Sequence, residues 1–75
     1  MMMPINTDLQ TWGASLVIDF PNDNVPLYFT GDDWRTWGNM LRQENTFANN
    51  GVPGTEHYPE WTEWALAVYR QMANF

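Results

Sequence analysis

Acidic side chains gather at two points of the chain where the sequence predicts that helices begin. Asp32 and Asp33 stand at the first point, and Glu56, Glu60 and Glu63 stand at the second. Two carboxylates with different pKa values can share the work of a general acid and a general base. Helix capping and the helix dipole explain such carboxylates equally well, and a chain of 75 residues has little room for a substrate cleft. We therefore expect no catalytic residue among them.

The chain has one histidine and no cysteine, which limits the other reactive sites that it can build. A metal site with two histidines or with thiolates is impossible within one chain. A catalytic pair of His57 with Asp or Glu, acting on Ser15 as the sole serine, would need two distant segments to converge. Helix capping or simple exposure is therefore the more economical interpretation of His57. The turn at residues 19–24 offers oxygen ligands for Ca²⁺, but turn formation alone explains its composition. The sequence predicts no metal site and no cofactor.

Tryptophan is the most prominent side chain, with five copies in the chain. Trp34 and Trp37 lie one helical turn apart and are followed by a small residue and an aliphatic one, and Trp61 and Trp64 begin the same pattern again. Two copies are too few for a solenoid. We interpret each copy as a bulky pair beside a small residue that lets another element approach closely.

Two kinds of periodicity predict the elements that carry these residues. Apolar residues occupy alternate positions from Trp12 to Phe20, a turn sequence follows at residues 21–24, and the alternation resumes at Val25, so we predict a β-hairpin over residues 12–30. A capping box that starts at Thr30 predicts a helix over residues 31–49. A stripe of apolar residues with helical spacing predicts a second helix over residues 58–74.

These elements predict a fold of the α+β class. The N-terminal β-hairpin is followed by two amphipathic helices (ββαα) in a single small domain at residues 12–75. An isolated hairpin is marginal in water, so the helices must cover its apolar face. Residues 1–11 carry no sustained period, and we expect them to form a loose N-terminal arm.

Composition and charge exclude several classes of function. The chain carries nine acidic residues against three basic ones, for a net charge of -6. Direct binding to nucleic acid and binding to anionic membranes are therefore disfavoured. The absence of cysteine excludes a disulfide scaffold. We recognise no signal peptide and no apolar run of about 18 residues, so we expect neither classical export nor a membrane span.

Both predicted helices carry apolar residues outside their main stripes, on flanks that one small core cannot cover. Tryptophan and tyrosine side chains on an exposed apolar surface of this kind are frequent anchors of protein interfaces. The candidate protein-binding residues are Trp34, Trp37, Met40, Phe47, Trp61, Trp64, Leu66 and Tyr69. The alternative for the tryptophans is that all five belong to the core. We expect a non-enzymatic assembly module that binds a protein partner or further copies of itself in a homo-oligomer.

Two segments of nine residues carry a resemblance to a known group of proteins. They are Asp33-Trp34-Arg35-Thr36-Trp37-Gly38-Asn39-Met40-Leu41 and Glu60-Trp61-Thr62-Glu63-Trp64-Ala65-Leu66-Ala67-Val68. Both are similar to the W-x-x-W-[AG]-x-x-aliphatic helices of small bacteriophage virion proteins of the tail, fibre or cement type. The resemblance implies a structural role in an assembled particle, hence a place in the virion or the host cytoplasm. It supplies no catalytic residue.

Two other functions remain open. An acidic phage-encoded inhibitor could present carboxylates in place of phosphates to a host defence or nucleic-acid enzyme. Such mimicry needs dense charge, roughly one charge per 3.4 Å along each strand, whereas only 16% of the residues here are charged. Exposed tryptophan beside Asn and Asp could instead stack on sugar rings.

Overall fold

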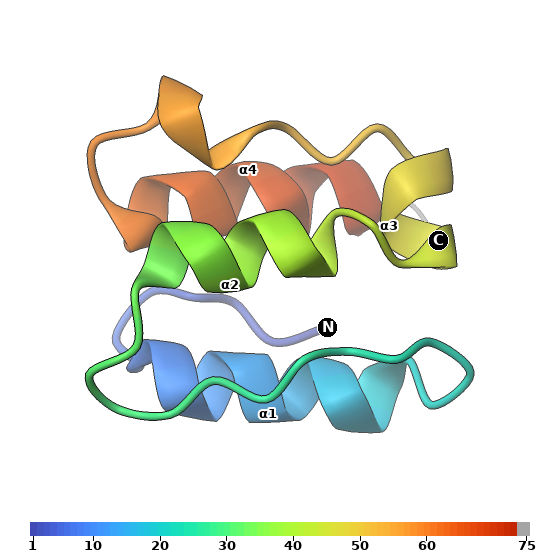
Figure 1. Ribbon diagram of the computed structural model, residues 1–75, viewed down its shortest axis with the longest axis horizontal. Coiled ribbons are helices and arrows are strands. Elements are labelled where there is room, and N and C mark those ends of the chain that lie inside the picture. The colour runs from blue at the N-terminus through green and yellow to red at the C-terminus, as the bar shows by residue number, and fades with distance from the viewer. Residues whose placement is uncertain (74–75) are drawn as a thin grey trace.

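The computed structural model describes residues 1–73 as helices joined by extended segments (Figure 1). The elements are α1 (Leu9–Asp19), α2 (Trp34–Leu41), α3 (Asn45–Asn49), the 3₁₀ turn η1 (Thr55–His57) and α4 (Trp61–Met72). No β-strand occurs within these 73 residues, so the predicted ββαα fold is wrong and the chain is helical.

The three longer helices run in the same direction. In Figure 1, α1, α2 and α4 all begin at the left end of the molecule and end towards the right. Parallel helices cannot be joined by tight turns, so the chain returns along the bundle before each new helix. Residues 25–30 return before α2, residues 50–59 return before α4, and residues 1–7 lie in the same way before α1 (Figure 1).

Helix α1 takes the place of the first predicted strand. Leu9, Trp12, Gly13 and Leu16 are buried and have the i, i+3, i+4, i+7 spacing of one helix face. The alternation that suggested a strand arises because the outer face of this helix is also apolar, with Ile18 largely exposed. The boundary that we expected between the arm and the domain, at residue 11, falls inside α1.

The first predicted helix, over residues 31–49, is two helices. Asp33, not Thr30, caps α2 by accepting a hydrogen bond from the N–H of Thr36 at 3.1 Å. After Leu41 the backbone tightens, because the N–H of Glu44 bonds to the carbonyl three residues back rather than four. Helix α3 therefore starts in a new direction.

The turn at residues 19–24 fixes that new direction. The carboxylate of Asp23 accepts a hydrogen bond from the N–H of Thr46, in the first turn of α3, at 3.2 Å. Phe47 then points inward, where its ring meets that of Phe20 edge to face at 4.9 Å between centroids. A residue that the continuous helix placed on an outer flank thus becomes part of the core.

The second predicted helix is confirmed as α4, although it begins at Trp61 rather than residue 58. Its predicted apolar stripe faces the core, because Trp64, Ala65, Val68 and Met72 are buried. The predicted end at residue 74 lies outside the described residues.

The helices that run in parallel are three copies of one sequence unit. The third copy is Asp8-Leu9-Gln10-Thr11-Trp12-Gly13-Ala14-Ser15-Leu16, beside residues 33–41 and 60–68. Each helix begins directly after an acidic residue, at Leu9, Trp34 or Trp61, and the side chains of Asp8 and Asp33 cap the first two. Each carries tryptophan at its fourth position, a small residue at its fifth and a buried aliphatic residue at its eighth. Three stacked units are what a repeat architecture needs to bury a common core.

Candidate functional site

One tryptophan from each repeat meets the other two in the centre of the bundle. The ring centroids of Trp12, Trp37 and Trp64 lie 6.1 to 6.2 Å apart, with interplanar angles of 69° to 85°. Edge-to-face contact of this kind places the positive edge of one ring against the negative face of the next. All three rings are buried, with 3% or less of their surface exposed.

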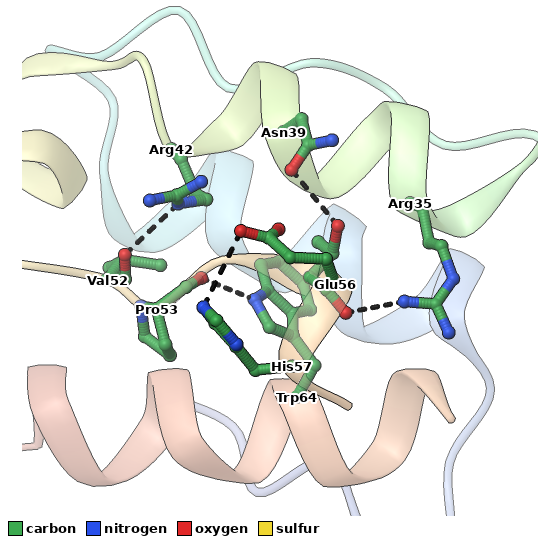
Figure 2. Close-up of polar contacts among 9 residues, drawn as sticks. Arg35, Asn39, Arg42, Val52, Pro53, Glu56, His57 and Trp64 are labelled. Carbon is green, nitrogen blue, oxygen red and sulfur yellow. Dashed lines mark hydrogen bonds and ion pairs between the residues drawn. The ribbon is translucent and has the colours of Figure 1, made fainter. Parts of the chain in front are cut away.

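Each of these three rings is also tied to the extended segment that precedes its own helix. The indole N–H donates to a backbone carbonyl, so no buried donor is left unpaired. The acceptors are Met2 for Trp12, Pro26 for Trp37 and Pro53 for Trp64, each at 2.8 Å. Figure 2 shows the bond between Trp64 and Pro53. Residues 1–7 thus lie against α1, and Pro4 among them is fully buried.

The eight candidate interface residues differ in their exposure and fall into three groups. Trp37, Phe47 and Trp64 are core residues and have almost no exposed surface. For the two tryptophans this agrees with the alternative interpretation, in which they belong to the core. Met40 is half exposed. The remaining four are partly buried and keep some surface for contact with a partner: Trp34, Trp61, Leu66 and Tyr69.

Most of the exposed apolar surface lies elsewhere, on and beside α1. Ile18 is 78% exposed. The extended segments on either side of α1 add further apolar side chains. We call this set the α1 face, and it comprises Met2, Met3, Ile5, Val17, Ile18 and Phe29. Leu27 is also exposed, but it lies beside Trp37 and Met40 of α2. Sequence reasoning missed the α1 face because a strand was predicted here, although the lack of any charged residue from 9 to 18 was a usable signal.

The seam between α2 and the segment before α4 is polar by contrast (Figure 2). Arg42 donates through Nε to the carbonyl of Val52 at 3.1 Å, and the hydroxyl of Thr55 donates to Asn39 at 3.0 Å. Arg35 donates to the carbonyls of Thr55 and Tyr58. These bonds hold the connector in place and leave no comparable apolar surface there.

Two aspartates have shifted acidity because they cap helices. The pKa of Asp8 is lowered mainly by a hydrogen bond from the backbone N–H of Thr11, and to a lesser degree by one from the Thr11 side chain. The pKa of Asp33 is lowered mainly by a hydrogen bond from the side chain of Thr36, and to a lesser degree by one from the backbone N–H of Thr36. Both effects stabilise the ionised carboxylate, as expected for a cap.

Asp32 and His57, two of the other candidate groups for chemistry, lie beside structural partners. Asp32 accepts the N–H of Phe29 at 2.9 Å, and the exposed side chain of His57 lies 3.6 Å from Glu56. Within residues 1–73, no three His, Asp or Glu side chains are arranged to hold a metal ion. In the turn considered for Ca²⁺, Asp23 is engaged with α3.

Comparisons with known proteins add no relative. No family model matches the chain, and neither the curated proteins nor the solved structures hold a significant match. In the part of the chain that the structure describes, no helix has the length and the apolar character needed to cross a membrane.

Proposed function

We propose that this chain is a non-enzymatic assembly module that binds protein through the α1 face. The observation that carries the proposal is a difference between the repeats. Aligned on their central tryptophans, the position of Ile18 is Gln43 in the second repeat and Arg70 in the third. All three side chains are exposed, so the core does not require an apolar residue there.

Two further exposed residues of α1 are apolar where the second repeat is polar. Ala14 matches Asn39 and Val17 matches Arg42, whereas the third repeat carries Leu66 and Tyr69 at these positions. Apolar surface that the core does not need and that several neighbouring segments share is typical of a binding surface. A second copy of the chain is the partner we propose first, because contact between two α1 faces would remove apolar surface from water on both sides.

A structural component of a phage particle is the setting that we propose for this module. The proposal rests on the resemblance of the W-x-x-W helices to those of small virion proteins. Such a component would assemble into the tail, an adaptor or a cement layer through contacts that do not require catalysis. Apolar contacts of this kind should tolerate salt.

Light scattering on the full chain over a concentration series, at low and high salt, tests self-association. We expect a mass above the monomer that rises with concentration and changes little with salt. Ile18→Gln, which introduces the residue of the second repeat, should shift the equilibrium towards monomer with unchanged circular dichroism. Gln43→Ala is the matched control and should leave the mass unchanged. A monomer at every concentration would contradict self-association.

An acidic inhibitor is the alternative, and one observation favours it. Five of the nine acidic residues stand at the common end where α1, α2 and α4 begin: Asp8, Asp32, Asp33, Glu60 and Glu63. An inhibitor that acts through these charges should bind a basic partner with steep salt dependence. Ile18→Gln should then leave its binding unaffected.

A further inference from the structure

A second feature of the surface lies at the end where the three helices begin. A pocket of about 350 Å³ opens there, at the lower limit of the size of ligand sites. Three aromatic rings line it, together with one carboxylate, one amide and one hydroxyl. We call it the aromatic cup, and its residues are Asp8, Leu9, Gln10, Tyr28, Thr30, Trp34 and Trp61.

Comparison of the repeats shows that the core does not need both large rings of the cup. Trp34 and Trp61 occupy the first helical position, where α1 carries Leu9. Leu9 fills that position and is buried, whereas both tryptophans remain partly exposed. Within residues 1–73, neither of these two indole N–H groups donates a hydrogen bond, unlike those of the central tryptophans. The three rings of the cup pack against the central tryptophans, at 5.9 to 6.3 Å between ring centroids, and each ring keeps part of its surface exposed.

The electrostatics of this end favour a cation. The five carboxylates at the helix starts outnumber the basic side chains there, since Arg35 is the one basic residue in the first turns of α1, α2 and α4. The dipoles of three parallel helices add only about +0.5 charge each. Asp8 lines the cup itself, and the helix-capping hydrogen bonds lower the pKa of its carboxyl further below the ordinary aspartate value.

One ring of the cup already contacts a cation within the chain. The guanidinium of Arg35 lies 4.4 Å from the centroid of the Trp34 ring. This distance is within the range of a cation–π interaction, which is strongest with tryptophan. Trp61 and Tyr28 have no such partner among the described residues.

We propose that the aromatic cup binds an arginine or lysine side chain of a partner protein. The cationic group would lie against Trp61 and Tyr28 and pair with the carboxylate of Asp8. The indole N–H groups would be available to backbone carbonyls of the same partner segment. The cup adjoins the α1 face but shares no residue with it, so either proposal can fail alone.

Nuclear magnetic resonance of the full chain, in the Ile18→Gln background if the native chain associates, tests the cup directly. The probes are Nα-acetyl-arginine amide and Nα-acetyl-lysine amide, whose side chains keep their positive charge. Nα-acetyl-glutamine amide is the neutral control. We expect the two basic probes to shift the indole N–H signals of Trp34 and Trp61 and to leave those of the central tryptophans in place. No shift, or an equal shift with the neutral amide, would overturn the proposal.

Two variants locate the charge and the ring that matter. Asp8→Asn keeps the cap but removes the charge, and it should weaken binding about threefold to fivefold. Trp61→Leu introduces the residue of the first repeat and should abolish the response. Asp19→Asn, at the other end of α1, is the matched control and should bind normally. Equal affinity for Asp8→Asn and the native chain, or shifts with methyl glucoside alone, would reject a cation site.

Discussion

A Cβ atom on Gly38 would lie 3.0 Å from Cη2 of Trp64, so this ring rests on the backbone of α2. Gly13 stands in the same relation to Trp37, at 3.2 Å from Cζ2. The small residue after each of these tryptophans thus makes room for the tryptophan of the next repeat. This contact explains why a large and a small residue recur as a pair.

Gly38→Ala should destabilise the protein. The new Cβ would also lie 2.7 Å from the buried Cγ2 of Thr55. Overpacking costs roughly 1–3 kcal/mol, and better helix propensity returns about 1 kcal/mol. We therefore expect a net loss of about 1 kcal/mol in the free energy of unfolding, measured in urea.

The double variant with Thr55→Ser provides the control for this clash. Serine lacks the methyl group but keeps the hydroxyl that donates to Asn39. Gly38→Ala should therefore cost less free energy of unfolding in the Thr55→Ser chain than in the native chain. A Gly38→Ala chain more stable than the native one would refute the close approach of Trp64.

Phe47→Ser should unfold the protein or nearly so. The ring is fully buried against Phe20, and loss of such a ring costs roughly 3–5 kcal/mol. Circular dichroism should show loss of helix at room temperature. A folded variant that merely fails to associate would restore Phe47 as an interface residue.

Asp33→Ala should lower the melting temperature more than Asp33→Asn does. Alanine leaves the N–H of Thr36 without its acceptor, whereas asparagine is an equally good cap. Thermal unfolding at neutral pH measures both variants. Equal melting temperatures would mean that this cap contributes nothing to stability.

Stability should fall in acid through Asp8 and Asp33. Both pKa values are lowered by folding, so their contribution is complete above the ordinary aspartate pKa of about 3.9 and is lost as the pH falls through the lowered values. Urea unfolding at a series of pH values should show this decline below about pH 4. The double variant Asp8→Asn, Asp33→Asn should have a flatter profile in that range.

The sequence allowed α4 to be predicted because its apolar residues have a single period. Helix α1 could not be predicted in this way. Ile18 extends the apolar pattern onto the outer face of the helix, so the apolar residues alternate as they do in a strand. The sequence still contained the correct answer, since Trp12 and Gly13 repeat Trp37 and Gly38 with the same acidic cap. Repeat detection over the whole chain would have identified the helix.

Other features depend on contacts that no local pattern reveals. The break between α2 and α3 is held by Asp23, which is distant in sequence from the N–H of Thr46 that it binds. Phe47 is buried only because of that break. The α1 face likewise becomes visible only when Ile18 is known to lie on a helix whose other side fills the core.

The bonds from the three central indoles to their own preceding segments have a consequence for folding kinetics. Each closes a loop of 10 or 11 residues. Loops of about 10 residues close in roughly 10–100 ns, far faster than separate helices find one another. We expect each segment to meet its own helix first, so that the slow step is the docking of three prearranged units. A chain ordered in this way should refold in microseconds to milliseconds, as proteins rich in local contacts do.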